Sequence, residues 1–321
     1  MNAERPPSIE VTLTDQPSAE RLDVFIAGRY SDISRSRAVR LLRSGYITVN
    51  GEKARPNQRP RMGDKICINM PTTTETLVPE HSPVDILLED PEFAVINKPA
   101  GIIMHPGSGV SCGTLAHRLV AKFPETHHVG HPKRPGLVHR LDKETSGVVV
   151  VARTSEIYLH LTQAFERREI QKRYLLIVNG TPRSEQGIVE APIGRHPSRR
   201  THMAVTSNGR PSKTYYKVLD KSGSQALVQV QPITGRTHQI RVHMAAIGHP
   251  IVGDSTYGTK SPDGIRTLLH AWTIEFTDHI DRSWLVACPP PNDFKQAAES
   301  LKLALPKTPN STLQTRYRGN R

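Results

Sequence analysis

The sequence predicts an α+β protein, in which a mainly antiparallel, mixed sheet forms the larger domain and a small α/β module precedes it. Two observations support this fold class. Short apolar segments separated by turn residues recur from Val84 onwards, and only two helical stretches interrupt them. Before them, residues 21–70 combine two short amphipathic helices with strand-like segments. A chain of 321 residues is long enough for one large and one small domain.

The small module, residues 21–70, follows residues 1–20, which we expect to be flexible. Its first helix is predicted within RLDVFIAGRY, where Leu22, Phe25 and Ile26 have the spacing of one helical face.

The second helix is predicted within SRSRAVRLLRSG, with Ser34 as N-cap and Gly45 as the C-terminal stop. Its apolar face consists of Ala38, Leu41 and Leu42. The opposite side carries the basic residues Arg35, Arg37, Arg40 and Arg43.

A hairpin follows in ITVNGE, because Asn50-Gly51 suits a type I′ turn, and GDKICIN is a further strand. Arg55 and its basic neighbours in this region extend the arginine surface, which is suited to phosphates. The alternative is an ordinary solvated charged face. The segment SRSRAVRLLRSGYITVNGEKARPNQRPRMGD resembles the S4 RNA-binding domain. The resemblance implies that Arg35, Arg37, Arg40, Arg43 and Arg55 bind RNA, and it implies no reaction.

The overall charge agrees with a polyanionic partner, because the formal net charge is +13 and the isoelectric point is about 9.9. A basic protein without such a partner is the alternative. Three widely spaced cysteines form no CxxC motif, and the histidines lack metal-binding spacing, so we expect no metal. The N-terminus lacks an apolar signal region and no apolar run is long enough to span a membrane, so a cytoplasmic protein is expected.

The remaining chain divides into a linker at 71–83, a catalytic domain at 84–302 and a disordered basic tail at 303–321. The expected strands of the large domain are VDILLED, FAVINKPAG, GLVHRLD, GVVVVART, RYLLIVNG, KTYYKVLD and QALVQVQP. The expected helices are SEIYLHLTQAFERREI and THQIRVHMAAIG.

The stretch HRLDKETSG, residues 139–147, places several charged residues between two apolar segments. It is not a kinase catalytic loop, because Leu141 interrupts His-Arg-Asp and Gly147 occupies the place of the required Asn. Asp142 and Glu144 are too close in sequence to predict the opposed carboxylates of a glycosidase. Taken alone, Asp142 could simply pair with Arg140.

Four motifs in order give this stretch a specific meaning. GLVHRLDKETSGVVVVART resembles the central motif of the RluA family of pseudouridine synthases, and NKPAGIIMHPG resembles the first motif of that family. QKRYLLIVNG contains the expected Lys172 and Tyr174, and TGRTHQIRVHMAAIGHPIVGDSTYG resembles the third conserved block. The likeness spans Val84 to about Phe294, and the preceding S4-like segment makes it closest to the members acting on the large ribosomal subunit. FTDHIDRS departs from the His-Pro pair of many relatives.

The resemblance implies roles for residues of the catalytic domain. Asp142 is the catalytic carboxylate, Tyr174 stacks on the target uracil, and Arg236 pairs with Asp142. Arg140 helps to displace the base and Ile240 closes the apolar wall of the pocket. His139 and Thr145 are further substrate-binding positions implied by the motif. Without the motifs, Tyr174 and Ile240 would read as core residues, and Arg236 as a phosphate contact.

The expected function is therefore the isomerisation of uridine to pseudouridine in large-subunit ribosomal RNA. The reaction needs no redox change, which agrees with the missing nucleotide, flavin and metal motifs, so no cofactor is expected. The expected partner is ribosomal RNA or a pre-ribosomal particle, and the expected state is a monomer. Two alternatives are a ribosome-assembly factor without catalysis and an RNA glycosylase or nuclease. The sequence does not identify the target uridines.

Overall fold

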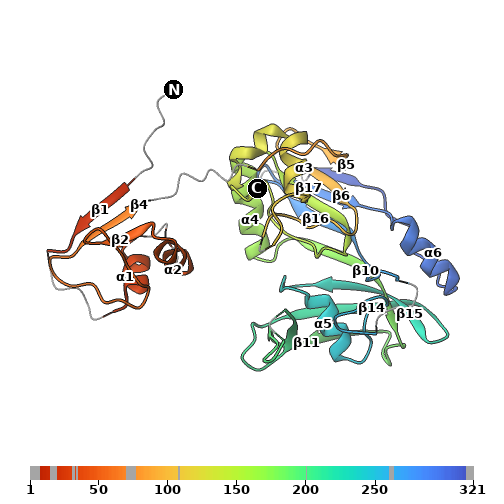
Figure 1. The fold of residues 1–321 in the computed structure, drawn as a ribbon. Helices are drawn as coiled ribbons and strands as arrows, with labels where there is room; N and C mark the ends of the chain where they lie inside the picture. The colour runs from red at the N-terminus through yellow and green to blue at the C-terminus, as the bar shows by residue number, and fades with distance from the viewer. Residues whose placement is uncertain are drawn as a thin grey trace, which may run out of the picture. The chain divides into compact units, whose positions relative to one another are not determined.

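The computed structural model describes residues 8–14, 20–30, 33, 35–69, 77–107, 109–199, 201–259 and 264–315. The chain divides into two compact units, Met1–Thr74 and Glu75–Arg321 (Figure 1). Ser34, the expected N-cap, lies outside the described residues. Among the described residues, no helix is both long and apolar enough to cross a membrane.

The first unit contains a four-stranded antiparallel sheet, in the order β1-β4-β2-β3, and two helices. Its elements are β1 (Ser8–Thr12), α1 (Leu22–Arg29), α2 (Arg35–Arg43), β2 (Ile47–Val49), β3 (Glu52–Lys53) and β4 (Lys65–Asn69). Strand β1 pairs with β4 along its whole length, so the expectation that residues 1–20 are flexible is wrong for this segment. Val11 packs against the core of the unit, and this contact gives the segment a reason to be ordered.

The predicted helices and hairpin of this unit are confirmed. Leu22 and Ile26 of α1 are fully buried, and the apolar face of α2 is buried with them. Gly45 follows α2 with φ +78° and its N–H donates to the carbonyl of Leu42, which ends the helix. Asn50 and Gly51 both have positive φ angles, 54° and 83°, as a type I′ turn requires.

The second unit is built on a ten-stranded sheet. Eight strands run in the order β11-β14-β15-β10-β16-β9-β6-β5, while β17 pairs with β16 and with β18. Every pairing in it is antiparallel except that of β9 with β16, which agrees with the predicted mainly antiparallel sheet. Its strands are β5 (Asp85–Glu89), β6 (Phe93–Lys98), β9 (Ser146–Ala152), β10 (Gln171–Asn179), β11 (Gln186–Glu190), β14 (Lys213–Ser222), β15 (Gln225–Pro232), β16 (Leu269–Thr277), β17 (Arg282–Ala287) and β18 (Thr312–Thr315).

Helices and two small hairpin sheets complete the unit. The helices are α3 (Leu115–Lys122), the 3-10 helix η1 (Pro124–His128), α4 (Ser155–Glu166), α5 (Gln239–Ala246) and α6 (Asn292–Ser300). The small sheets pair β7 (Gly130–His131) with β8 (Arg134–Pro135) and β12 (Ile193–Arg195) with β13 (Met203–Val205).

Strand β9 is buried on both faces, as its run of valines predicts. Val149 and Val151 belong to the core cluster that includes α3, whereas Val148 and Val150 belong to the cluster that includes α4. The two helices therefore cover opposite faces of the sheet at this strand. Packing on both faces therefore holds β9 in place, and the HRLDKETSG motif runs directly into this strand.

Both predicted boundaries of the large domain need correction. Leu77 is buried in its core and the N–H of Gly113 donates to Glu80 Oε1 at 2.6 Å, so the linker expected at 71–83 already packs on this unit at its C-terminal end. The tail expected at 303–321 is ordered in its described part, residues 303–315. Leu303 is buried and β18 pairs with β17, because the edge of β17 offers unpaired backbone groups.

One predicted strand is absent. GLVHRLD is a loop in which Leu137 makes a single bridge to Val151. The other strands and both helices predicted in this unit are present.

Candidate active site

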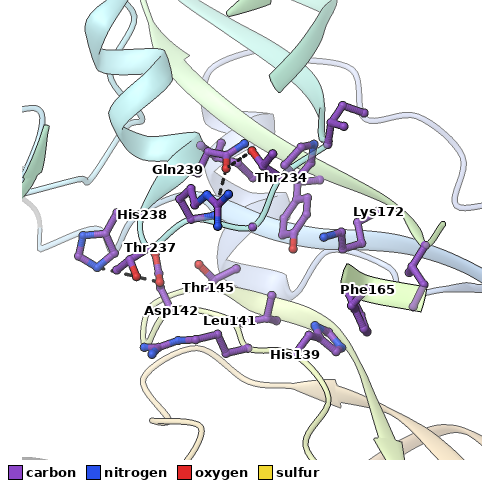
Figure 2. Close-up of a pocket in the computed structure, with 18 of the residues that line it drawn as sticks. His139, Leu141, Asp142, Thr145, Phe165, Lys172, Thr234, Thr237, His238 and Gln239 are labelled. Atoms are coloured by element: carbon purple, nitrogen blue, oxygen red, sulfur yellow. Dashed lines mark hydrogen bonds and ion pairs between the residues drawn. The ribbon is translucent and has the colours of Figure 1, made fainter. Parts of the chain in front are cut away.

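A cavity of about 480 Å³ is lined mainly by five segments of the second unit: the HRLD loop, the end of α4 with the turn after it, the start of β10, the turn after β15 and the first turn of α5. Figure 2 shows Asp142 and His238 on one side of it, with His139, Phe165 and Lys172 on the other. All seven residues predicted for the catalytic domain line this cavity: His139, Arg140, Asp142, Thr145, Tyr174, Arg236 and Ile240.

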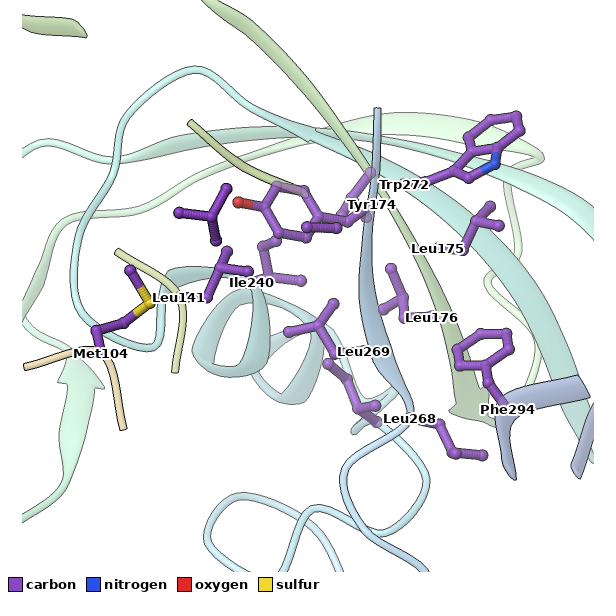
Figure 3. Packing of buried hydrophobic residues seen from close by; sticks show 14 of the residues in the cluster. Met104, Leu141, Tyr174, Leu175, Leu176, Ile240, Leu268, Leu269, Trp272 and Phe294 are labelled. Atoms are coloured by element: carbon purple, nitrogen blue, oxygen red, sulfur yellow. The ribbon is translucent and has the colours of Figure 1, made fainter. Parts of the chain in front are cut away.

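The HRLD loop is anchored by the side chains of His139 and Leu141. The Nε2 atom of His139 accepts a hydrogen bond from the N–H of Val150 at 2.9 Å, and its ring stacks on Phe165. Leu141 is buried near Ile240 (Figure 3). Arg140 is exposed, and the Asp142 side chain is 20% exposed. The loop therefore holds two residues inward and leaves the arginine and the carboxylate accessible.

Burial sets the protonation of His139. Burial, with a further contribution from the charge of Lys172, lowers the pKa of the imidazole to about 3. His139 is therefore neutral at physiological pH, with its proton on Nδ1, because Nε2 accepts from the backbone. This geometry makes His139 an anchor of the loop.

Gly147 ends the motif for a steric reason. Its φ angle is +113°, and a Cβ atom there would lie 2.1 Å from the carbonyl oxygen of Ala271 on β16. Gly147 pairs with Ala271 in the parallel ladder, so the two backbones approach where only glycine fits.

The cation nearest to Asp142 is Arg241, and the prediction that Arg236 pairs with this carboxylate is wrong for this structure. Arg241 NH1 lies 3.6 Å from Asp142 Oδ2, and His238 Nε2 lies 4.0 Å from Oδ1. Arg236 precedes α5, and its Nε donates to the carbonyl of Pro211 at 3.4 Å. Arg241 lies on the first turn of α5, which turns its side chain toward the carboxylate.

Arg241 is itself held by a second carboxylate. Its Nε and NH2 atoms donate to the two oxygens of Asp254 at 2.7 and 2.8 Å. Asp254 is fully buried, and its Oδ1 also accepts from the backbone N–H of Thr256 and Tyr257. Burial raises the pKa of Asp254, but the hydrogen bond and the charge of Arg241 together lower it by more. The pKa of Asp254 therefore lies below the ordinary value. The bidentate pair therefore fixes the guanidinium beside Asp142.

His238 has a left-handed backbone, with φ 56° and ψ 20°, immediately before α5. Such a conformation is costly for a residue other than glycine and often occurs at functional sites. The His238 Nδ1 and the Tyr257 hydroxyl are 2.7 Å apart, in hydrogen-bond contact. Burial lowers the pKa of His238, although Asp142 opposes this shift. The neutral imidazole leaves Arg241 as the main positive charge beside Asp142.

Tyr174 and Lys172 project from the same face of β10, because they are two residues apart. Tyr174 is 8% exposed and lies near Ile240 (Figure 3). Burial, followed by the charge of Asp142, raises the pKa of its hydroxyl, which stays protonated. Burial lowers the pKa of Lys172 to about 8, and its ammonium lies 5.3 Å from the centre of the Phe165 ring.

Sequence reasoning missed several residues of this site: Arg241, His238, Asp254 and Tyr257. All four lie inside the motif TGRTHQIRVHMAAIGHPIVGDSTYG. A charged residue between the apolar Ile240 and Val242 was the available signal for Arg241. No local signal indicated that Asp254 would be its partner, since thirteen positions separate them.

The predicted RNA-binding arginines lie on the other unit. Arg40, Arg43 and Arg55 are exposed, and the side chain of Arg37 lies outside the described residues. Arg35 Nε donates to Asp23 at 2.9 Å, and Arg21 pairs with the same buried carboxylate. This pairing partly neutralises the charge of Arg35.

One group of potential metal ligands lies outside the cavity. Among the described residues, Glu92, Glu156 and His279 bring their ligand atoms within 4.8 Å of one another. His279 Nε2 is 3.6 Å from Glu92 and 3.7 Å from Glu156, so the group is explained by ion pairs when the imidazole is protonated.

Comparisons with known proteins identify both units. Residues 92–246 match the family model described as RNA pseudouridylate synthase, and residues 20–66 match the S4 domain. An uncharacterized RNA pseudouridine synthase of Aquifex aeolicus is 41% identical over 78% of this chain and 80% of its own length. The ribosomal large subunit pseudouridine synthase D of Nitrosomonas europaea is 38% identical over 92% of this chain and 88% of its own length.

A solved structure agrees with the fold of the second unit. The human RNA pseudouridylate synthase domain containing 4 is 28% identical, with a TM-score of 0.56, over 70% of this chain and 95% of that one. The cavity, the sequence motifs and these relatives lead to one conclusion: the chain belongs to the RNA pseudouridine synthase family and carries an S4 domain at its N-terminus.

Proposed function

We propose that this enzyme converts specific uridines of large-subunit ribosomal RNA to pseudouridine, with Asp142 as the catalytic carboxylate. The observation that carries the proposal is the cavity, in which Asp142, Tyr174, Arg140 and Ile240 surround one space of about 480 Å³. Such a volume is within the range of small-ligand sites. Relatives named for the large ribosomal subunit support the choice of RNA.

The chemistry requires little beyond a well-placed carboxylate. The bond between C1′ and N1 of the uridine breaks and a bond between C1′ and C5 forms. The hydrogen of C5 leaves to solvent, N1 gains a proton, and no electrons are transferred to another molecule. Carboxylates perform covalent catalysis in other reactions at sugars. Asp142 is accessible from the cavity, and Arg241 places a compensating positive charge 3.6 Å away.

The target base must leave its stack before it can react, which costs a few kcal/mol. Tyr174 would stack on the uracil, and Ile240 would provide an apolar wall behind it. Arg140 is exposed at the HRLD loop and would fill the gap left in the RNA. His139 and Thr145 would contribute to substrate binding mainly by holding the loop.

The S4 domain would provide affinity for the larger RNA. Its exposed arginines would contact phosphates, and the protein would act as a monomer on ribosomal RNA or a pre-ribosomal particle. In this proposal the first unit binds RNA outside the target uridine, and the second unit carries out the isomerisation.

The test compares Asp142→Asn with wild type for tritium release from ribosomal RNA labelled at C5 of its uridines. Asn keeps the shape of the side chain and removes its charge, so release should stop while RNA binding remains. Asp281→Asn is the matched control, because Asp281 does not line the cavity and Asn tolerates its positive φ. Substantial release by Asp142→Asn would refute the assignment.

The products separate this function from cleavage. Pseudouridine formation leaves both the length and the mass of the RNA unchanged. Shortened RNA would indicate a nuclease, and free uracil would indicate a glycosylase.

A further inference from the structure

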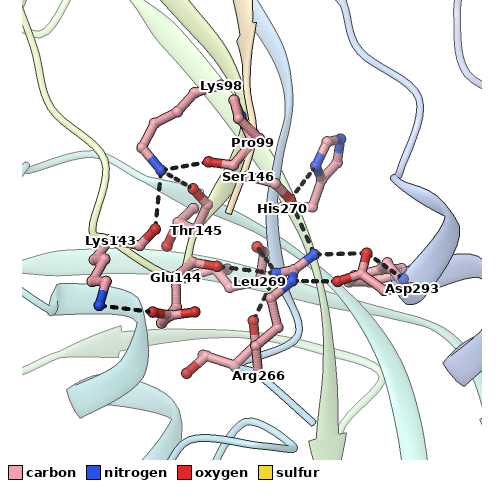
Figure 4. A network of polar contacts seen from close by, with 12 residues as sticks. Lys98, Pro99, Lys143, Glu144, Thr145, Ser146, Arg266, Leu269, His270 and Asp293 are labelled. Carbon is pink, nitrogen blue, oxygen red and sulfur yellow. Dashed lines mark hydrogen bonds and ion pairs between the residues drawn. The ribbon is translucent and has the colours of Figure 1, made fainter. Parts of the chain in front are cut away.

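The main chain that follows Asp142 is held by two basic side chains, that of Lys98, which is fully buried, and that of Arg266, which is largely buried (Figure 4). Lys98 Nζ donates to the carbonyl oxygens of Lys143 at 3.1 Å and Thr145 at 2.8 Å. Arg266 NH1 donates to the carbonyl oxygen between them, that of Glu144, at 3.0 Å. Three successive peptide groups of the loop are therefore fixed by side chains from other parts of the chain.

Arg266 connects the loop to two other segments. Its NH1 also donates to the carbonyl of Thr267 at 2.9 Å, and its NH2 to the hydroxyl of Ser146 at 3.3 Å. Its Nε and NH2 donate to Asp293 of α6, at 2.5 and 3.2 Å. The Arg266 side chain is only 12% exposed, and a planar guanidinium with this many bonds has a single orientation.

The carboxylate of Asp142 depends on its backbone for placement. Its contacts with Arg241 and His238 are long, 3.6 and 4.0 Å. Among the described residues, the Asp142 carboxylate accepts no hydrogen bond from another group. Long contacts leave the oxygens available to a substrate, but they do not define the side-chain position as short hydrogen bonds do. The peptide groups just after Asp142 must therefore determine where the carboxylate lies.

We propose that Arg266, oriented by Asp293, is a positioning residue for Asp142. The inference rests on the proposed function of Asp142. Arg266 does not line the cavity, so it acts through the backbone of the loop and not on the RNA. A displacement of about 1 Å in a reacting group can reduce the rate about 100-fold. Loss of Arg266 should therefore lower kcat and leave KM nearly unchanged.

The test measures kcat and KM for Arg266→Lys and Asp293→Asn with C5-tritiated ribosomal RNA. Lysine keeps the charge but cannot donate to the loop and to Asp293 together, so kcat should fall about 10- to 100-fold. Asp293→Asn keeps Arg266 and loses only the charged bidentate contact, so its kcat should lie between that of Arg266→Lys and that of wild type.

Arg282→Lys is the matched control. Arg282 is also partly buried and bonded to carboxylates, with Nε 2.6 Å from Asp278 and NH2 3.2 Å from Asp90, and its contacts among the described residues do not include the loop. Its variant should lose thermal stability and keep its kcat. This separates positioning from general destabilisation.

The outcomes distinguish the two proposals. Wild-type protein that forms no pseudouridine refutes the proposed function itself. An active wild type with an inactive Asp142→Asn, but with unchanged kcat in both Arg266→Lys and Asp293→Asn, refutes only the positioning role. A rise in KM at constant kcat, or an equal loss of kcat in Arg282→Lys, also overturns it. If Arg266→Lys does not fold, Asp293→Asn decides.

Discussion

The pair formed by Arg241 and Asp254 allows a quantitative prediction for Asp254→Asn. Asp254 is fully buried and makes two short hydrogen bonds to a guanidinium that is 11% exposed. Removing one partner of a buried ion pair typically costs about 3–5 kcal/mol, because a charge remains without compensation. Asp142 lies 3.6 Å from the same guanidinium and can compensate part of it, so we expect the low end, about 3 kcal/mol.

Calorimetric unfolding measures this cost. For a unit of this size, each kcal/mol shifts Tm by about 2–4 °C, so Tm of the catalytic unit should fall by about 6–12 °C. The kcat should fall as well, because Arg241 is then free to move onto Asp142 and occupy the oxygens that face the cavity. Asp281→Asn serves as the control. A Tm within about 2 °C of wild type would refute the view that Asp254 is what holds Arg241 in place.

Three further predictions concern the base, the pH dependence and the RNA. Tyr174→Leu should bind RNA about 1–3 kcal/mol more weakly than Tyr174→Phe, because only Phe keeps a stacking ring; equal affinities in a filter-binding titration would make Tyr174 a core residue. The folded pKa values of His139 and His270, lowered mainly by burial to about 3 and about 4, lie below the ordinary value of 6.5. The stability that these two neutral histidines contribute is therefore fully present above pH 6.5. It is lost as the pH falls from 6.5 towards the folded pKa values, by about 1.4 kcal/mol per pH unit for each histidine. Urea unfolding at pH 7, 5.5 and 4.5 should show a smaller loss in His139→Gln than in wild type, and equal losses would contradict this origin. A protein beginning at Glu75 should bind ribosomal RNA with a shallower salt dependence, since about 0.7 in the log–log slope is lost per missing phosphate contact; an unchanged slope would show that the arginines of α2 are only solvated.

Local patterns correctly predicted four helices, α1, α2, α4 and α5, together with the hairpin turn and all but one of the expected strands. Helices α3 and α6 and strands β16 and β17 were missed. The spacing of Leu22, Phe25 and Ile26 and the Asn50-Gly51 turn depend on nearest neighbours in sequence, and such signals are strong. The run of valines in GVVVVART predicted a strand, and the structure shows that this strand, β9, is buried on both faces. The motifs likewise brought all seven predicted residues to one cavity.

The errors arise where distant segments decide the structure. GLVHRLD has the apolar alternation of a strand, but Leu141 is buried in the core and His139 bonds to Val150, which pulls the segment out of the sheet. Ser8–Thr12 and Thr312–Thr315 become strands only because β4 and β17 offer them an edge. Whether Arg236 or Arg241 lies beside Asp142 depends on where α5 begins. The spacing of the motif alone does not determine the start of this helix.

The close approach of Gly147 to Ala271 affects how genetic data on this protein should be interpreted. Gly147 contributes no side chain, yet any larger residue would force β9 and β16 apart, because a Cβ atom would lie 2.1 Å from a carbonyl oxygen. A mutational screen that scores only pseudouridine formation would therefore rank Gly147 with Asp142 as equally indispensable. The amount of folded protein in the cell would differ between them: substitutions of Gly147 should deplete it, whereas Asp142→Asn should leave it intact.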